Sequence, residues 1–322
     1  MSDAWVLLAA RSRRLPAGED ALSAAIDPVR RCLAGPSARG TPIARVVGAG
    51  RSAREVGLIA GLPVSVPAWG LSGGGLQALA AAAHAVAGGF DRQVLVTAVS
   101  APAAPAPPPS PHLEWAFERA DDALGGDRLR DRHGMTDPVL AAWVAQRVER
   151  RDAAPPRPRL QGGGDTAAEP GVRAARVEAA AALRLVDSAT AAASPFSPRA
   201  RVVAVCGAGV DPADPLRAPQ AAAAAALERA GLSADRIDAW AVAASHAAVA
   251  FDLTAALGLD PERLDPEGGA LARGYAGAAT GLVELVDLLD HLDDIEGRFG
   301  LVVETAQDGI ATAAILDREV WA

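Results

Sequence analysis

Residues 64–85 read VSVPAWGLSGGGLQALAAAAHA, and this stretch predicts a strand, a tight turn around Ser72 and an alanine-rich helix. Gly73, Gly74 and Gly75 permit positive φ angles or a close approach of the backbone to another group. The helix begins with unpaired amides, and the positive end of its dipole lies beside Ser72. A side chain at this elbow is well placed to attack a carbonyl, provided that other groups of the chain assist it.

Composition narrows the class of protein. The 322 residues suffice for one large or two medium domains, and half of them are apolar, with only 4% aromatic. Alanine supplies much of the apolar content, so we expect closely packed helices and sheets with small side chains. The formal charge of −8 is spread along the chain and argues against a nucleic-acid surface. No stretch is apolar enough for a membrane span, and the N-terminus does not resemble a signal peptide, so we expect a cytoplasmic protein.

The two cysteines, Cys32 and Cys206, lie far apart and match no metal or redox spacing. We expect both to be buried thiols in a reducing compartment. Three carboxylates near loop ends of the second half, Glu267, Glu304 and Asp308, are interpreted as solvated or capping groups. The sequence therefore predicts neither a metal centre nor a tightly bound cofactor.

The first half of the chain alternates between strand-like and helix-like segments. Strands are predicted at residues 5–10, 43–48 and 93–99, and helices at 21–33, 52–60 and after the elbow. This alternation predicts a mainly parallel sheet covered by helices. The proline-rich residues 101–111 then mark an excursion from the sheet, with lid helices at 113–124 and 138–151 and a loop at 154–171.

From residue 199 the alternation starts again. Strands are predicted at 201–206, 237–243, 300–304 and 309–316, with helices at 218–230, 247–257 and 280–292 and a glycine-rich turn at 268–279. Residues 172–185 are compatible with either helix or strand. The similar order of elements in the two halves indicates an internal duplication.

Six segments of the chain, taken in order, carry a family resemblance. They are AREVGLIAGLPVSVPA (53–68), SGGGL (72–76), AHAVAGGFDRQVLVTAVSAPA (83–103), HGMTDPVLAAWVAQR (133–147), CGAGVDPADPLRAPQAAAAAALERAGLSADRIDAWAV (206–242) and EGGALARGYAGAATG (267–281). This ordered set resembles the thiolase superfamily. The resemblance implies a thiolase-like α/β fold of two similar halves in α-β-α-β-α layers. It also implies an N-terminal half at 1–103 and 172–198, a shortened lid at 104–171 and a C-terminal half at 199–322.

The catalytic groups that the resemblance implies are replaced in this sequence. Thiolases carry a cysteine nucleophile, because a thiolate is nucleophilic and a good leaving group, and Ser72 stands in its place. Tyr275 stands where the family has its catalytic histidine, and tyrosine, with a pKa of about 10, is a poor base at neutral pH. The asparagine-glutamate-alanine-phenylalanine motif falls on residues 243–246, which read AASH and end in His246. The second catalytic cysteine is expected at 303–305, where neither cysteine nor histidine occurs.

Two functions follow from this pattern, together with one competing fold. The first function is a non-catalytic thiolase-like subunit that binds an acyl-CoA or acyl-carrier thioester. It would pair as a homodimer, or as a heterodimer with a thiolase, a ketosynthase-like protein or a small OB-fold protein. The second is a serine acyltransferase or hydrolase, with Ser72 as nucleophile and His246 as base. In the competing fold, residues 70–74 form the G-x-S-x-G elbow of α/β-hydrolases, with His246 or the surface residue His291 as base.

Several residues are then candidates for the acyl-thioester site. Gly73, Gly74 and Gly75 would donate oxyanion hydrogen bonds, and Gly274 would line the pocket beside Tyr275. Tyr275 would donate a hydrogen bond or fill the pocket as an ordinary aromatic. His246 would serve as a base only if it lies about 3 Å from the Ser72 hydroxyl, and would otherwise be a packed side chain. Condensation by the route that thiolases use is not expected from this residue set.

Overall fold

The structure is a computed structural model that describes residues 3–12, 14–16, 19–34, 42–50, 53–100, 118, 120–155, 172–306 and 309–318. The proline-rich residues 101–111, most of the first predicted lid helix, most of the loop at 154–171 and Asp308 lie outside the described residues. Within the described part, no helix combines the length and apolar character that crossing a membrane requires.

In the part of the chain that the structure describes, nine strands form one mixed sheet, and a further two-stranded ladder pairs β2 with β6. The order across the large sheet is β4-β3-β5-β7-β1-β8-β11-β10-β9. The strand bounds are β1 Ala4–Arg11, β2 Leu15–Pro16, β3 Arg45–Gly50, β4 Ala68–Leu71, β5 Gln93–Val99, β6 Val177–Glu178, β7 Ala180–Asp187, β8 Ala200–Gly209, β9 Ala239–Ala243, β10 Phe299–Ala306 and β11 Ile310–Asp317. Of the ambiguous residues 172–185, those at 177–178 and 180–185 form strands, and none is helical.

Helices connect and cover these strands. Their bounds are α1 Ala21–Leu33, α2 Ala53–Ile59, α3 Gly75–Ala87, α5 Asp122–Arg132, α6 Asp137–Ala153, α7 Ser188–Ala192, α8 Ala218–Ala230, α9 Ala247–Leu257, α10 Gly269–Arg273 and α11 Thr280–Asp294. The predicted glycine-rich turn at 268–279 instead contains α10 and a short 3₁₀ turn, η5 (Gly277–Ala279).

The strand pairing reveals the internal duplication. In the first half, β1 and β5 each run antiparallel to β7, and β5 runs parallel to β3. In the second half, β8 and β10 each run antiparallel to β11, and β10 runs parallel to β9. The two four-strand patterns match strand for strand. Helix α3 precedes β5 just as α11 precedes β10, so the elbow helix and α11 occupy equivalent places.

The prediction of a mainly parallel sheet is wrong. Of the strand pairs in the large sheet, only β3–β4, β3–β5 and β9–β10 are parallel. The last strand of each half, β7 or β11, inserts antiparallel between two others, and a local pattern of alternating elements does not reveal this long-range pairing.

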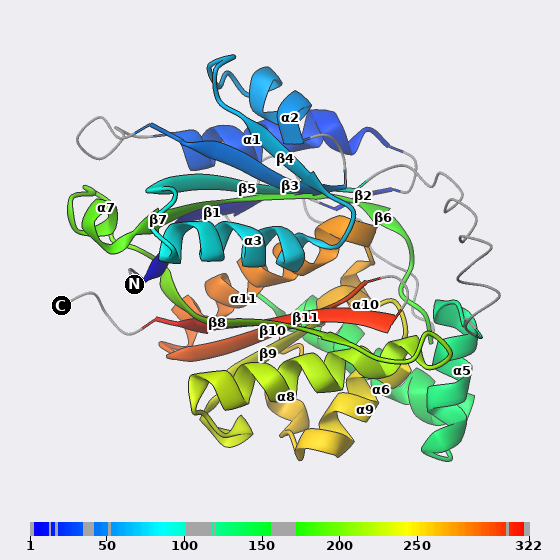
Figure 1. Cartoon of the computed structure of the whole chain (residues 1–322). Helices are drawn as coiled ribbons and strands as arrows, with labels where there is room; N and C mark the ends of the chain where they lie inside the picture. The colour runs from blue at the N-terminus through cyan, green and yellow to red at the C-terminus, as the bar shows by residue number, and fades with distance from the viewer. Residues whose placement is uncertain are drawn as a thin grey trace.

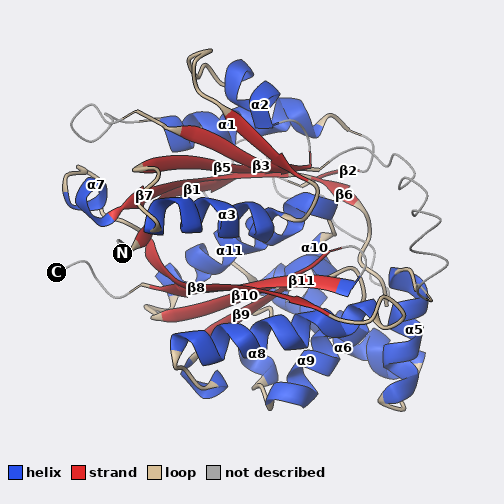
Figure 2. Cartoon of the chain, viewed as in Figure 1, coloured by secondary structure: helices blue, strands red, loops and turns tan. Residues whose placement is uncertain are grey.

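The large sheet consists of two halves that are joined only where β1 pairs with β8, near Trp5 and Val6. The two halves lie in separate strand layers, and with the helices they form a stack of five layers. Figure 1 shows α1 and α2 above the strands of the first half, with α3 and α11 between them and the strands of the second half. Helices α8, α9 and α6 lie below the second half, and Figure 2 shows the same alternation of helical and strand layers. The arrangement matches the predicted α-β-α-β-α layering.

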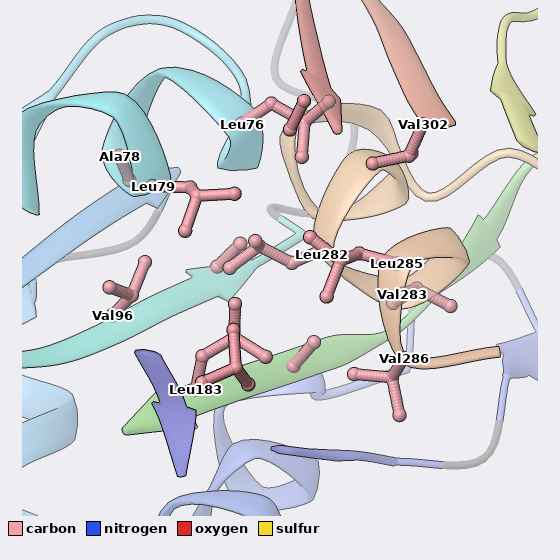
Figure 3. Close-up of a cluster of buried hydrophobic side chains, with 14 of the residues drawn as sticks. Leu76, Ala78, Leu79, Val96, Leu183, Leu282, Val283, Leu285, Val286 and Val302 are labelled. Carbon is pink, nitrogen blue, oxygen red and sulfur yellow. The ribbon is translucent and has the colours of Figure 1, made fainter. Parts of the chain in front are cut away.

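The central layer is packed with aliphatic side chains. Leu76 and Leu79 of α3 are fully buried together with Leu282 and Leu285 of α11. Figure 3 shows this cluster with Val96 and other side chains from the flanking strands. The two helices begin in direct contact, because a Cβ on Gly75 would lie only 2.7 Å from Cγ of Leu282. Burial of these leucines holds the two halves together and fixes where both helices begin.

A buried ion cluster adds a second connection between the halves. Arg14, next to the first strand, donates from Nη2 to Oε1 of Glu284 at 2.6 Å and to Oδ2 of Asp287 at 3.2 Å. Arg11 of β1 pairs with the other oxygen of Asp287. Since Glu284 and Asp287 belong to α11, the cluster links the first strand to the central helix of the second half.

Candidate functional site

The elbow forms as predicted, but with a different use of its glycines. Strand β4 ends at Leu71, the Ser72 side chain is exposed, and α3 begins at Gly75. None of the three glycines at 73–75 has a positive φ. They allow close approach instead, since a Cβ on Gly73 would lie 1.5 Å from Oε1 of Gln77 and one on Gly74 would lie 2.3 Å from Cδ of Glu304.

The group beneath this elbow is Glu304 of β10. Its carboxylate accepts a hydrogen bond from the Leu76 amide at 2.7 Å and another from the Gly281 amide at 2.9 Å. Leu76 lies in the first turn of α3 and Gly281 in the first turn of α11. One carboxylate therefore binds the N-termini of both central helices, each of which would otherwise leave amides unsatisfied.

Among the residues that the structure describes, no cationic side chain pairs with Glu304. Only 2% of this residue is exposed, and burial raises the pKa of its carboxyl from 4.5 to about 7. The amides of Leu76, Gly281 and Gly75 act in the opposite direction and lower the pKa. The positive ends of two helix dipoles meet here, so an anion is the natural occupant of the space between them.

The structure places His246 at the start of α9, as its N-cap residue. Its Nδ1 accepts a hydrogen bond from the Ala248 amide at 3.1 Å, which fixes the proton of the neutral ring on Nε2. The ring is 2% exposed, and a Cβ on Gly126 of α5 would lie 2.2 Å from its Cδ2. These contacts make His246 a packed capping residue against α5.

A substitution tests this capping role. We expect His246→Ala to lower the free energy of unfolding by about 1–3 kcal/mol, because the cap and the ring packing are both lost. His246→Asn keeps a good capping acceptor and should retain most of the stability that alanine loses. Urea unfolding of the three proteins measures the difference. Equal stability of the alanine and asparagine variants would contradict a capping role.

Tyr275 and Gly274 lie in the segment between α10 and α11. The Tyr275 amide donates to the carbonyl of Ala175 at 2.8 Å, and its carbonyl accepts from the Val177 amide at 3.1 Å. Gly274 has a φ of 104°, and a Cβ there would lie 2.4 Å from Cγ1 of Val177. Both residues thus hold the backbone of this loop against residues 175–177, and the part of Gly274 in a pocket remains a prediction.

One expectation about the charged groups of the second half is confirmed and one is wrong. Glu304, expected to be solvated or capping, is buried and caps two helices. His291 was expected on the surface, yet its side chain is only 19% exposed and its Nδ1 lies 3.2 Å from Oε1 of Glu267. Glu267 also pairs with Arg273 at 3.5 Å and is itself 8% exposed.

The cysteines do not supply a replacement for the missing nucleophile. Both are buried and free, as predicted. Cys32 donates from Sγ to the carbonyl of Ala182 at 3.2 Å, and burial raises the pKa of its thiol to about 12. Its thiolate is therefore scarce at neutral pH. Among the described residues, no three His, Cys, Asp or Glu side chains are grouped so that they could hold a metal ion.

Sequence reasoning missed the role of Glu304. Its partners are backbone amides 228 and 23 residues away, and backbone amides leave no trace in a side-chain pattern. One signal was available: the strand sequence FGLVVETA places a single carboxylate inside an apolar run. A charge on the inward face of a buried strand indicates a specific set of hydrogen-bond partners.

The sequence of this chain is similar to those of known thiolases. Residues 196–318 match the model of the thiolase C-terminal domain. Beta-ketothiolase BktB of Cupriavidus necator is 38% identical over 141 residues, which cover 44% of this chain and 36% of the relative. Steroid 3-ketoacyl-CoA thiolase FadA6 of Mycobacterium tuberculosis is 31% identical over 159 residues, which cover 47% of this chain and 39% of the relative.

A longer match extends the similarity to the first half of the chain. An acetyl-CoA acetyltransferase of Pseudomonas aeruginosa is 27% identical over 329 aligned positions, which cover 83% of this chain and 84% of the relative. The stronger matches to BktB and FadA6 span less than two fifths of those proteins. The duplicated sheet, the two central helices and the elbow agree with these matches and not with an α/β-hydrolase. The family match over residues 196–318 and the longer match to the acetyl-CoA acetyltransferase support membership of this chain in the thiolase superfamily.

Proposed function

We propose that this protein binds an acyl-CoA or acyl-carrier thioester without catalysing condensation, as a non-catalytic subunit in acyl-thioester metabolism. The observation that carries the proposal is the hydrogen bonding of Glu304 to the amides of Leu76 and Gly281. Amides at the start of an elbow helix normally stabilise the oxyanion that forms on a substrate carbonyl. In this chain a carboxylate of the protein already uses them.

The residues around the elbow support the same proposal. Ser72 replaces a thiol and has an exposed side chain, and no hydrogen bond joins it to a basic group among the described residues. An unactivated serine hydroxyl is a weak nucleophile. The position of the family's oxyanion asparagine holds Ala243, which is fully buried in β9 and offers no side-chain donor.

The alternative is a serine enzyme that uses Ser72 and His246. In that reaction the Ser72 hydroxyl attacks the thioester carbonyl, His246 accepts the proton, and the thiolate of coenzyme A leaves and takes up a proton. The exposed position of Ser72 at the start of α3 favours it. The hydrogen bond that Nδ1 of His246 accepts from the Ala248 amide opposes it, because the neutral ring then carries its proton on Nε2 and has no nitrogen free to accept the proton of Ser72.

The proposed partner is a second thiolase-like chain, either a copy of this one or a related protein. Strand β4 forms one edge of the large sheet, and Trp69 on it is 47% exposed, with the guanidinium of Arg45 3.9 Å from its ring centre. An open edge strand is a ready template for pairing with another chain. A heterodimer with an active thiolase, a ketosynthase-like protein or an OB-fold protein would supply the missing chemistry.

Mass spectrometry of the intact protein tests the proposal. We expect acetyl-CoA and longer acyl-CoA esters to leave the mass of the wild-type protein unchanged, with or without a co-expressed thiolase-family partner. Titration calorimetry should show that the thioester binds, and that Ser72→Ala, which changes only an exposed hydroxyl, does not alter its affinity.

Two other outcomes have distinct meanings. Acylation that Ser72→Ala abolishes would overturn the non-catalytic assignment and support the serine enzyme, and His246→Asn would then test whether His246 is the base. Absence of any thioester binding, by the chain alone or with its partner, would overturn the proposed ligand class.

A further inference from the structure

The space between the starts of α3 and α11 has the properties of a carboxylate-binding cradle. One oxygen of the Glu304 carboxylate accepts from the Leu76 amide, and the other accepts from the Gly281 amide. The two donors belong to helices of 13 and 15 residues, so a full dipole supports each of them. Planar carboxylates suit such a pair because each oxygen meets one donor.

Glycines on both sides keep this space open. A Cβ on Gly74 would lie 2.3 Å from Cδ of Glu304, and a Cβ on Gly281 would lie 2.4 Å from the same atom. Any other residue at either position would take the space of the carboxylate. The glycines are an observation independent of the hydrogen bonds, and they indicate a cradle shaped for a small planar anion.

We propose that this cradle is a binding site for a small carboxylate and that Glu304 fills it as a tethered ligand, which closes the elbow amides to external anions. This inference rests on the proposed function, and it explains why the elbow amides do not stabilise an oxyanion. While Glu304 stays in the cradle, a thioester oxygen has no access to the amides of Leu76 and Gly281. The external ligand that fits is a monocarboxylate of two carbons or fewer, such as acetate or formate.

Removal of the tethered ligand should open the site to acetate. We expect acetate to raise the melting temperature of Glu304→Ala by about 2 °C when its concentration is ten times its dissociation constant. Sodium chloride at the same ionic strength should have no such effect. The wild-type protein should not respond, and neither should Glu304→Gln, because a glutamine side chain fills the cradle without leaving room for a ligand.

The pH dependence of acetate binding provides a further test. The cradle is bordered by Gly74, which caps α3, by Gly75 and Leu76 of α3 and by Gly281 of α11. Ala243 and Thr312 lie opposite Glu304 on the neighbouring strands, and none of these residues has a side chain that titrates. Burial that raises the pKa of Glu304 should act on bound acetate in the same way. Acetate should therefore bind with proton uptake, and more tightly at pH 6 than at pH 8.

Each remaining outcome decides the proposal. Equal stabilisation of wild type, Glu304→Gln and Glu304→Ala would identify a general salt effect and overturn it, as would no stabilisation of the alanine variant. If Glu304→Ala does not fold, its refolding yield in acetate is compared with that in chloride, and equal yields would likewise overturn it. The experiment contains no thioester, so its failure is distinct from failure of the proposed function.

Discussion

Replacement of Arg14 by methionine should lower the free energy of unfolding by about 3–5 kcal/mol, as for other buried ion pairs that lose one partner. Arg14 is 1% exposed, and its Nη2 contacts Glu284 at 2.6 Å and Asp287 at 3.2 Å. Methionine occupies similar space but removes the cation that contacts both buried carboxylates, whereas Arg11 pairs with Asp287. Urea unfolding at pH 7 measures the loss.

The loss should also depend on pH. Burial raises the pKa of Glu284 to about 7, and the Arg14 charge opposes that rise. Without Arg14 the pKa rises further, so the folded protein holds a proton that the unfolded chain releases above its ordinary value of 4.5. Stability then falls as pH increases beyond that value, and the cost of Arg14→Met should be smaller at pH 5 than at pH 8.

A matched substitution separates this effect from a general loss of charge. Arg201 also contacts a carboxylate, Asp317, at 3.2 Å, but its side chain is 36% exposed. Arg201→Met should therefore cost less than about 1 kcal/mol. Comparable losses at the two arginines, or a pH-independent loss at Arg14, would contradict the account of a buried cluster that joins β1 to α11.

The elements predicted best from the sequence are those with local boundaries. The helices Ala21–Leu33, Ala218–Ala230 and Ala247–Leu257 and the strand Gln93–Val99 have the bounds expected of them. Glycine follows two of these helices directly and adopts the left-handed conformation in both, at Gly231 and Gly258. Such signals act over a few residues, and the sequence displays them in full.

Sheet order and the interior of the site depend on long-range contacts. Strand β7 lies between β5 and β1, and no local pattern distinguishes this antiparallel insertion from a parallel neighbour. The sequence predicts the elbow because its glycines lie beside Ser72 along the chain. It does not predict that Glu304 lies against the elbow, because Glu304 binds backbone amides of two helices and no side-chain pattern reveals such bonds.

The second large effect is the dependence of stability on pH that Glu304 causes. Its carboxyl has a pKa of 4.5 when exposed and about 7 in the fold, because burial outweighs the amides of Leu76, Gly281 and Gly75. Between these two pH values the folded protein binds a proton that the unfolded chain has released. The free energy of unfolding should therefore decrease as pH rises from 5 to 7 and level off above it, by roughly 3 kcal/mol from this group.

Glu304→Gln isolates that contribution, because glutamine has nearly the same volume and cannot ionise. Glu284 and Asp265, whose pKa values burial also raises, titrate in the same pH range in both proteins and cancel in the comparison. We therefore expect the stability of Glu304→Gln relative to wild type to improve by about 3 kcal/mol between pH 5 and pH 8.

The matched control for this comparison is Glu228→Gln, at an exposed position on α8. Its urea-unfolding curve should follow that of wild type at every pH. If Glu304→Gln also follows wild type, the carboxyl of Glu304 must be ionised throughout this range. The dipoles of α3 and α11 would then outweigh burial, and the cradle would hold a permanent anion rather than one that a change of pH neutralises.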